Sequence, residues 1–589
     1  MKSYFSKIFT GAALLSLAGF ASCTGDLDQL PQDPNSTTAV NFAENPREYI
    51  GGVMAKCYSS LAVSGQGGPN GDADISGLDG GTSQWTRTIF MLEEFPTDEN
   101  LWLYDDGGVD EMRWATWGSA NVAIFGTYSR LYTHIAVCND FIRLTRELGD
   151  YGIEVGGTGD TAISQAEIDQ FVLEARALRD LSYYYVIDFF GNAVVAWDDM
   201  AYGEIPPQTT RLELYNKVVE DLEDVLANFP DTTPVYGRIG KDAVEALLVK
   251  FYLNAEVYTG TAQWAKCYEH CKNIINRHQG GGYQGSGLAN DYLSLFCASN
   301  KMFAPGGALT AQNEILWNIP QATTYCEPWG GSTFLVNAAI KNMPNTDFTK
   351  GYMNQLWYGT NDSWSCMHAR KEFAELFDTY GDITGDKRTV LWLTESAGFS
   401  IENVPYNEFQ AGYASIKYTA VPCNSDGSMP IWDYTITDDN GLVLTLPRAG
   451  VADADGNVPY NGHHDTNVPV IRLAEIYLSA AECAYNGASG SSQSEGLNYV
   501  NLIRNRAGLG NITQLTSQAL LDERARELYW ENNRRTDLIR FGKWISGYNW
   551  SWKGGVQTGT NLPSHFNLYP LPSDVLATYG SAMTQNTGY

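Results

Sequence analysis

The chain of 589 residues carries 68 acidic against 38 basic side chains, which gives a formal net charge of -30 at pH 7. So large a negative charge argues against nucleic acid or another anionic polymer as the main ligand, and a neutral or cationic ligand fits better. Aromatic residues make up 13% and charged residues only 18%, beside 58 glycines. This composition indicates ordered cores joined by long loops rather than disorder.

The N-terminus has the pattern of a secreted lipoprotein. Basic Lys2 and Lys7 precede an apolar run that ends at Phe20, and small residues come directly before Cys23. A charged start, a short apolar stretch and small residues at the cut are the signature of a secretory signal, and the run is too short to span a membrane. We therefore predict a lipoprotein signal peptide at residues 1–22 and lipidation of Cys23. An ordinary signal peptide, with this cysteine incidental, is the alternative, because Phe20 fits a usual bacterial lipobox poorly.

Two segments of the first half predict amphipathic helices with a shared pattern. In residues 243–258, apolar side chains recur at helical spacing, and Gly260 ends the helix. Residues 171–190 carry a similar apolar face before Gly191. Because matching residues lie at matching distances from the terminal glycine, the two segments predict stacked helical hairpins.

Three further helices are predicted at residues 471–485, at 497–507, and from a cap at Thr516 through Glu531. Between about 280 and 465 the sequence is instead rich in Gly, Asn, Pro and Trp, with few sustained periodicities. Helical hairpins thus flank a middle of long loops. Loops mounted on a rigid frame are where binding residues usually lie.

The cysteines do not predict a disulfide scaffold. Ten cysteines in 589 residues are too sparse for one, and setting Cys23 aside leaves an odd nine. Cys267 and Cys271 lie one helical turn apart beside His270, which is compatible with a zinc site, but no second pair at metal-ligand spacing follows. We therefore expect buried free thiols, with no metal and no cofactor.

The C-terminal third contains a series of long, ordered motifs. They are Val468–Leu478 (VPVIRLAEIYL), Leu502–Gly508 (LIRNRAG), Asp522–Leu528 (DERAREL), Arg534–Gly542 (RRTDLIRFG), Tyr569–Pro572 (YPLP) and Gln585–Tyr589 (QNTGY). On these motifs, and on Arg176–Arg179 and Phe189–Asn192 earlier in the chain, the protein resembles the RagB/SusD family of outer-membrane nutrient-uptake lipoproteins. The resemblance runs along the whole mature chain.

The resemblance implies a mainly α fold, with a tetratricopeptide-like α-α superhelical scaffold and a large, irregular, loop-rich ligand-binding lobe. We expect a single SusD-like domain over residues 23–589, with the scaffold at about 40–280 and 466–545 and the lobe at about 65–118 and 281–465. Members of the family act as lids over a TonB-dependent transporter. The implied partner is therefore a SusC-like transporter, and the implied location is the outer face of the outer membrane, reached through the lipid anchor.

Several stretches are similar to starch-binding members of the family. They are Arg87–Phe90, Pro96–Glu99, Leu101–Tyr104, Gly330–Thr333 and Trp364–Cys366. Such members hold glucan on an arc of three aromatic side chains, and the resemblance places this arc on Tyr104, Trp329 and Trp364. It places the nearby polar contacts on Arg87 and, less closely, on Asp79. One position departs from the pattern, because Gly107 stands where those members have a contact asparagine.

These residue types also suit a sugar on physical grounds. A sugar ring presents an apolar C–H face and a rim of hydroxyl groups, so aromatic rings can cover the face while Arg and Asp bond to the rim. At roughly 25 cal/mol per Å² each covered face contributes about 1 kcal/mol, so the expected affinity is weak, roughly millimolar to tens of micromolar. Binding then depends on polymer length and multivalency. The alternative is that Trp329 and Trp364 are core residues in a chain with 16 tryptophans.

Taken together, these features predict a surface lipoprotein that captures a neutral glycan, with starch or malto-oligosaccharide first, and hands it on without cleaving it. Another glucan, a fructan or a host glycan stays possible because of Gly107. A surface glycoside hydrolase is the alternative from another class, since 68 acids can always offer two suitably spaced carboxylates, but no segment singles out such a pair. A structural lipoprotein, with an accidental aromatic arc, is a third reading.

Overall fold

The computed structural model describes residues 43–68, 71–232, 234–298, 300, 311–340, 355–378, 385–402, 409–424, 427–437, 443–449 and 462–589. The expected signal peptide and Cys23 lie outside these ranges, so their processing stays a prediction. Among the helices within the ranges, none is both long and apolar enough to cross a lipid bilayer.

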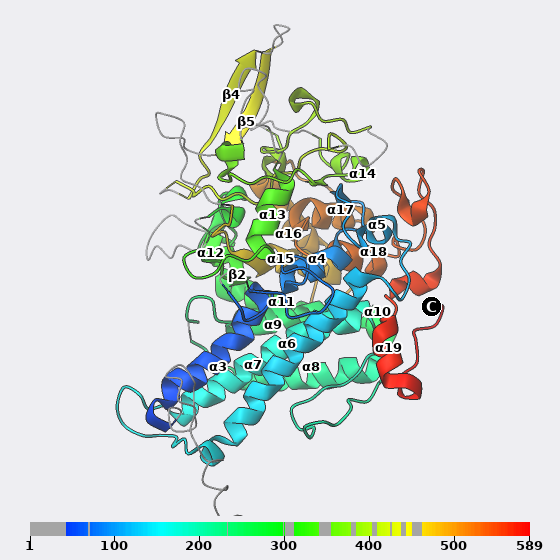
Figure 1. Ribbon diagram of the computed structural model, residues 1–589. Helices are drawn as coiled ribbons and strands as arrows, with labels where there is room; N and C mark the ends of the chain where they lie inside the picture. The colour runs from blue at the N-terminus through cyan, green and yellow to red at the C-terminus, as the bar shows by residue number, and fades with distance from the viewer. Residues whose placement is uncertain are drawn as a thin grey trace, which may run out of the picture. The chain divides into compact units, whose positions relative to one another are not determined.

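The fold is mainly helical, as predicted (Figure 1). The helices are α3 Pro46–Ala62, α4 Trp85–Glu93, α5 Val109–Trp114, α6 Val122–Arg146, α7 Gln165–Phe189, α8 Arg211–Asn228, α9 Lys241–Leu253, α10 Ala255–Thr259, α11 Trp264–His278, α12 Ala311–Glu314, α13 Gly331–Ala339, α14 Lys371–Ala374, α15 Leu473–Tyr485, α16 Gln493–Arg506, α17 Ser517–Leu528, α18 Arg534–Arg540 and α19 Ser573–Tyr579. The strands are β1 Leu101–Trp102, β2 Ile315–Ile319, β3 Met367–His368, β4 Ile431–Thr437, β5 Val443–Ala449 and β6 Val468–Arg472.

The chain divides into two compact units. One comprises Met1–Val53 and Leu144–Asp169, and the other comprises Met54–Arg143 and Gln170–Tyr589. Within the first unit, Arg47 Nε donates a hydrogen bond to the Ala162 carbonyl (2.8 Å), and the Arg47 guanidinium forms an ion pair with Glu167 (3.1 Å). All further contacts described below lie within the second unit.

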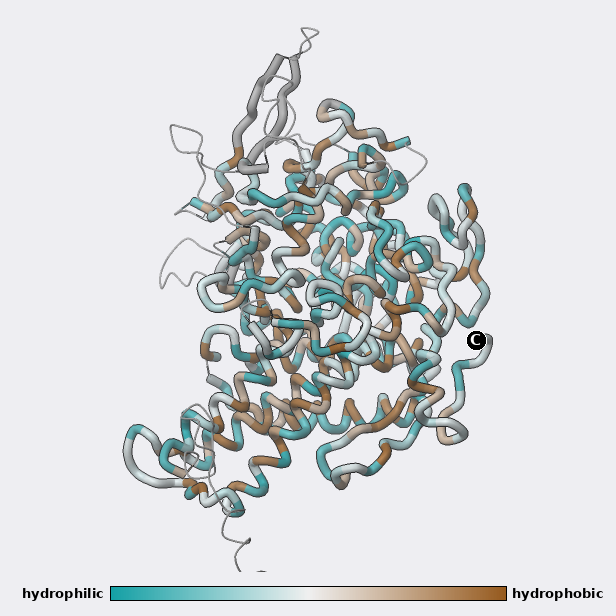
Figure 2. The backbone as a smooth tube through the Cα atoms, in the orientation of Figure 1, coloured by the Kyte–Doolittle hydropathy of each residue, from teal (hydrophilic) through white to brown (hydrophobic). Residues whose placement is uncertain are grey.

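The second unit contains the predicted helical hairpins. In sequence order, α8 packs on α9, α9 on α11, α11 on α15, and α15 on α16 and α17. Apolar residues recur along these helices between polar ones, as Figure 2 shows. The helix predicted at residues 243–258 is present as α9 followed by α10, and it ends at Gly260, which has a φ of +78°. A left-handed glycine at this position is a common helix terminator.

Helices α7 and α16 begin earlier than predicted, at Gln165 and Gln493 instead of 171 and 497, and two further helix ends also differ from the predictions. Ile471 and Arg472 belong to strand β6, which pairs antiparallel with β2, so α15 begins only at Leu473. Helix α17 ends at Leu528 instead of continuing through Glu531, because Trp530 and Asn532 adopt left-handed backbone conformations with φ of 58° and 60°. Both deviations depend on partners far along the chain, which helical periodicity does not reveal.

The charged residues of the C-terminal motifs form buried ion pairs. Arg472 on β6 binds Glu531 (Nε to Oε2, 2.6 Å) and also pairs with Glu527 (3.1 Å). Arg506 on α16 pairs with Glu314 (2.9 Å). All of these side chains are buried, where removal of one partner would leave an uncompensated charge. The network therefore ties β6, α12, α16 and α17 together.

A second set of buried charges anchors helix α4. Asp98, just beyond the end of α4, accepts hydrogen bonds from Arg534 Nε (2.7 Å) and Nη2 (2.6 Å). Glu94 Oε1 accepts from the backbone N–H of Asn532 (2.8 Å), and burial raises the pKa of Glu94 to about 7. These contacts hold α4 against the segment that leads into α18.

The described part of the predicted loop-rich middle, between about 280 and 465, contains only short elements. Its longest helix, α13, packs against α4. The described residues form two-stranded antiparallel sheets of β1 with β3, β2 with β6, and β4 with β5. The described middle therefore consists of short elements joined by loops, as expected from the sequence.

Candidate ligand-binding site

A hollow of about 190 Å³ lies beside α4 and α13. The residues that line it are Asp79, Gly81, Thr82, Arg87, Trp102, Tyr104, Asp106, Trp329 and Trp364. All five site residues predicted from the sequence are in this set. The structure thus brings together side chains from three separate stretches of the chain.

Arg87 is a buried cation that lines the hollow. It lies in the first turn of α4, where the side chain of Gln84 caps the helix by accepting a hydrogen bond from the Arg87 backbone N–H (3.0 Å). The guanidinium carbon lies 4.0 Å from the centroid of the Phe334 ring and 4.7 Å from that of the Trp102 ring. Two aromatic faces therefore orient this buried cation.

The N–H groups of the Arg87 guanidinium can donate hydrogen bonds to a ligand. It forms a long ion pair with Asp106 (3.6 Å), and among the residues that the structure describes it meets no acceptor within hydrogen-bonding distance. Burial lowers the pKa of Arg87 from 12.5, with Asp106 opposing the shift, and the side chain stays charged at neutral pH. A ligand hydroxyl or ring oxygen could accept from it.

Asp79 and Thr82 form a tight turn on one side of the hollow. Asp79 Oδ1 accepts from the Thr82 backbone N–H (2.8 Å), and Oδ2 accepts from Thr82 Oγ1 (2.6 Å). Burial opposes ionisation, but these bonds and the charge of Arg87 lower the pKa of Asp79 below its usual 3.8. Gly81 lets the turn lie against Trp329, since a Cβ at this glycine would stand 3.0 Å from the tryptophan Cβ. Asp79 is therefore a fixed, ionised acceptor.

Trp329 is positioned by the glycine pair that follows it. Gly331 begins α13 with a φ of +59°, and a Cβ at Gly330 would lie 2.5 Å from the Cβ of Gln84, the residue that caps α4. The two glycines thus permit the close approach of α13 to α4. Trp329 as a residue is 38% exposed, and its ring contacts the His463 ring, with centroids 4.4 Å apart.

Trp364 lies on a segment held between α13 and β1. The Trp364 backbone N–H donates to the Asn337 carbonyl (2.7 Å), and the Leu103 N–H donates to the Cys366 carbonyl (2.8 Å). The indole Nε1 of Trp364 donates to Asp362 Oδ2 (3.2 Å), which fixes the ring. Ser365 between these contacts has a φ of +51°, so the segment turns sharply after the tryptophan.

Tyr104 completes the aromatic set. Its ring is 37% exposed, packs edge-on against Phe409 (5.3 Å between centroids) and Trp102 (6.2 Å), and its hydroxyl donates to the Trp364 carbonyl (3.1 Å). Burial raises the pKa of Tyr104 above its usual 10.0, so the hydroxyl stays protonated as a donor. Neither Trp329 nor the half-buried Trp364 is a core residue. The alternative that placed these two tryptophans in the core is therefore wrong.

Four lining residues were not predicted from the sequence: Gly81, Thr82, Trp102 and Asp106. Trp102 is 1% exposed, stacks on Arg87, and donates from Nε1 to Asp106 Oδ2 (3.1 Å). Asp106 links this indole to the Arg87 guanidinium. Trp102 lies in the same short stretch as Tyr104, and Asp106 follows that stretch closely. Their closeness in sequence to Tyr104 could therefore have identified them as lining residues. Gly107, the departure noted in the sequence, does not line the hollow.

The described residues contain no group of three or more His, Cys, Asp or Glu side chains suited to a metal ion. Cys267 and Cys271, the pair considered for zinc, are buried free thiols. The hollow offers three partly exposed aromatic faces, a cation and an ionised carboxylate. This arrangement suits a ligand with apolar faces and hydroxyl edges.

Comparison with known proteins supports the resemblance seen in the motifs. A model described as the SusD family matches residues 427–589. Starch-binding protein SusD of Bacteroides thetaiotaomicron is 30% identical over 614 residues, with 100% of each chain covered. SusD-like protein P25 of Formosa agariphila is 25% identical, covering 65% of this chain and 66% of the relative.

Solved structures share the fold. A SusD superfamily protein of Parabacteroides distasonis superposes with a TM-score of 0.62 at 18% identity, covering 92% of this chain and 99% of that one. Surface glycan-binding protein A of Bacteroides thetaiotaomicron, in complex with laminarihexaose, gives a TM-score of 0.61 at 19% identity with the same coverage. The predicted scaffold and family are confirmed. The chain belongs to the SusD family.

Proposed function

We propose that this protein is a cell-surface glycan-binding lipoprotein that captures a neutral polysaccharide or oligosaccharide and delivers it to a SusC-like, TonB-dependent transporter. Starch or malto-oligosaccharide is the preferred ligand. The convergence of Tyr104, Trp329 and Trp364 with Arg87 and Asp79 around one hollow is the observation that carries the proposal.

The preference for an α-glucan rests on the relative named as starch-binding, which spans the full length of this chain. It also rests on aromatic side chains at all three positions of the arc that the resemblance implies. Each ring can cover one sugar face, while Arg87 and Asp79 provide a donor and an acceptor for hydroxyl groups. Gly107 stands where a contact asparagine was expected, so another glucan, a fructan or a host glycan is the alternative ligand.

Binding without cleavage is the proposed activity. A glycosidase that uses a carboxyl pair needs one of the two kept protonated near neutral pH. Asp79 does not suit the role of the protonated acid, because Thr82 and Arg87 lower its pKa despite its burial. The relatives named for an activity are named as binding proteins. We therefore expect no release of reducing sugar when the purified protein is incubated with amylopectin, and sustained release would overturn this part of the proposal.

The proposed location is the outer membrane, and the proposed partner is the SusC-like transporter. Lipidation of Cys23 would anchor the protein to the outer membrane, where it would act as a lid over the transporter. Co-expression with the SusC-like transporter should give a complex that co-purifies. The Cys23→Ala variant should be lost from the membrane fraction. Glycan import that is equally efficient without this protein would contradict the delivery role.

Native gels that contain soluble polysaccharides test the ligand. We expect retardation by amylopectin, glycogen and pullulan, and loss of retardation in Trp364→Ala, with Tyr325→Ala as the matched control because Tyr325 is an 86% exposed tyrosine outside the hollow. Retardation by laminarin or inulin alone would replace the α-glucan with another ligand. Retardation by none of these polymers would contradict glycan capture.

A further inference from the structure

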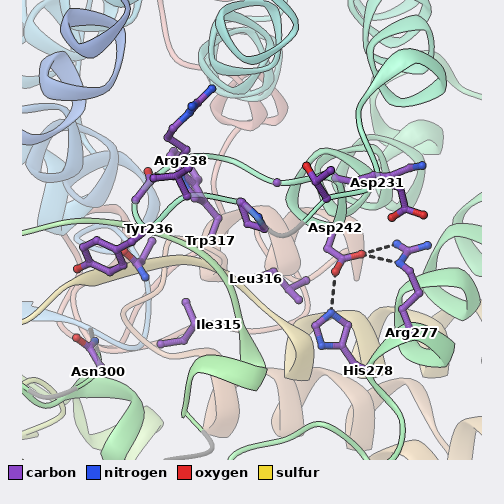
Figure 3. Close-up of a pocket in the computed structure, with 17 residues that line it drawn as sticks. Asp231, Tyr236, Arg238, Asp242, Arg277, His278, Asn300, Ile315, Leu316 and Trp317 are labelled. Atoms are coloured by element: carbon purple, nitrogen blue, oxygen red, sulfur yellow. Dashed lines mark hydrogen bonds and ion pairs between the residues drawn. The ribbon is translucent and has the colours of Figure 1, made fainter. Parts of the chain in front are cut away.

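A second cavity, of about 430 Å³, shares no lining residue with the aromatic hollow. It is lined by the loop that leads into α9, the start of α9, the end of α11, Asn300 and strand β2 (Figure 3). Its volume lies in the range of small-molecule sites, which is roughly 300 to 1,000 Å³. Nothing in the proposed capture mechanism uses it.

One side of this cavity is an aromatic platform. Tyr236 is 45% exposed, and its hydroxyl accepts a hydrogen bond from Asn467 Nδ2 (2.7 Å), so the ring is both accessible and fixed. The indole of Trp317 contributes to the same wall and donates to the Gly237 carbonyl (3.3 Å). A fixed ring loses little conformational entropy when a ligand covers it.

The other side carries charges that compensate one another. Asp242 accepts a hydrogen bond from Arg277 Nε (2.6 Å) and lies 2.9 Å from His278 Nε2, and Figure 3 shows it between the two. Arg277 also pairs with Glu245. Arg238 forms a two-bonded pair with buried Glu174, with Nε to Oε2 at 2.8 Å.

The balance of charge disfavours an ionic ligand. Arg238, Lys241 and Arg277 are the cations of the cavity, and four carboxylates, Asp231, Asp242, Glu174 and Glu245, line it or pair with its cations. An anion would therefore meet no excess of positive charge, and a cation would compete with arginines that already hold these acids. A neutral ligand with many hydroxyl groups can instead bond to donors and acceptors alike.

Polar groups without partners in the described part of the chain are present among the residues that line the cavity. Asn318 Oδ1 is buried at the edge of β2, and within the described residues it has no hydrogen-bond partner. Lys241 and Asp231 form no ion pair with any residue that the structure describes. A buried acceptor without a partner is costly, and a ligand hydroxyl would satisfy it.

We propose that this cavity is a second binding site, for a neutral polyhydroxylated ligand of mono- to disaccharide size, with Tyr236 as the platform and Asn318 as a hydroxyl acceptor. The site stands independently of the aromatic hollow. If both sites bind the same polymer, the second contact becomes intramolecular and raises the avidity of the chain for long glycans.

Hydrogen exchange monitored by mass spectrometry tests the proposal on the mature protein. The probes are maltohexaose, laminarihexaose and inulin-derived fructo-oligosaccharide, each in large excess, added to a Trp329→Ala/Trp364→Ala background in which the hollow is disabled. We expect at least one probe to slow exchange in peptides that cover residues 231–242 and 315–318. This protection should be lost in Tyr236→Ala and Asn318→Ala, and retained in Tyr236→Phe.

Tyr202→Ala is the matched control, because Tyr202 is 75% exposed and does not line the cavity; it should leave the protection unchanged. Thermal unfolding of each variant separates loss of binding from loss of fold. Absence of protection with every probe, or protection that persists in both Tyr236→Ala and Asn318→Ala, would overturn the second site. In the unsubstituted protein, protection at this cavity with no protection of the residues that line the aromatic hollow would overturn the proposed capture mechanism alone.

Discussion

The Tyr104 hydroxyl donates a hydrogen bond to the Trp364 carbonyl at 3.1 Å, although the two residues are 260 positions apart. Both rings line the hollow, and the Trp364 indole is itself held by Asp362. The bond therefore links the backbone of one aromatic platform to the side chain of another. Because the spacing between the two rings is already fixed, glycan binding costs less conformational entropy in these side chains.

The linkage predicts different effects for two substitutions of Tyr104. Tyr104→Phe keeps the ring and removes the bond, so the affinity for malto-oligosaccharide should fall only about two- to threefold, through weaker preorganisation. Tyr104→Ala also removes the platform, worth about 1 kcal/mol, and should weaken binding by a further fivefold or so. Calorimetric titration with maltoheptaose measures both. Equal losses in the two variants would contradict the role of the ring as a platform.

Asp79→Ala should weaken glycan binding with little effect on folding, because the residue is only partly buried and its partner Thr82 lies in the same turn. A lost charged acceptor predicts a cost of about 1.5 to 3 kcal/mol. Since the pKa of Asp79 lies below 3.8, the group stays ionised and the affinity of the unsubstituted protein should be constant between about pH 5 and 8. Affinity that changes tenfold across this range would argue against the assigned state.

Gly330→Ala should weaken glycan binding indirectly, by disturbing the packing of α13 against α4. The new Cβ would lie 2.5 Å from the Gln84 Cβ, which forces α13 away from α4 and costs about 1 to 3 kcal/mol of stability. Urea unfolding should show this loss, together with weaker retention on amylopectin gels. Gly118→Ala is the control, because a Cβ there would meet nothing within 4 Å. Unchanged stability in Gly330→Ala would show that the two helices are not in close contact.

Glu523 predicts a pH dependence of stability. It is fully buried, and although burial opposes ionisation, Arg388 and Arg526 lower its pKa from 4.5 to about 2. An acid with a lowered pKa in the folded state stabilises the fold above pH 4.5 and loses that effect as the pH falls toward 2. The contribution at neutral pH is roughly 3 kcal/mol.

Glu523→Gln should therefore lower the free energy of unfolding most at pH 7 and progressively less toward pH 3, as measured by urea titration. The exposed acid Glu220, replaced by glutamine, serves as the control and should have little effect at either pH. A deficit in Glu523→Gln that stays constant from pH 7 to pH 3 would contradict the proposed ion pairing.

The five residues predicted for the site came from the local resemblance to starch-binding members of the family, which placed each of them by position. Trp102 and Asp106 escaped notice because their roles arise only when α4 carries Arg87 between Trp102 and Phe334. Helix ends marked by glycine, such as Gly260, could be predicted because the left-handed φ that ends a helix favours glycine at that position.

The charged C-terminal motifs show where sequence reasoning stopped. The sequence showed their arginines only as parts of motifs, and the structure buries Arg472 and Arg506 against Glu314 and Glu527. Periodicity does not reveal a buried ion pair, because the partner lies far along the chain. The same limit applies to α15, where Ile471 joins β6 through pairing with β2.

Titration calorimetry of maltoheptaose into the purified mature protein tests the central claim most directly, with Trp329→Ala/Trp364→Ala and the Tyr325→Ala control alongside. The account predicts a Kd of roughly millimolar to tens of micromolar for the unsubstituted protein and for the control. It predicts binding about 30-fold weaker or undetectable in the double variant, from the loss of two platforms at about 1 kcal/mol each. Equal affinity in the double variant would contradict capture by the aromatic arc.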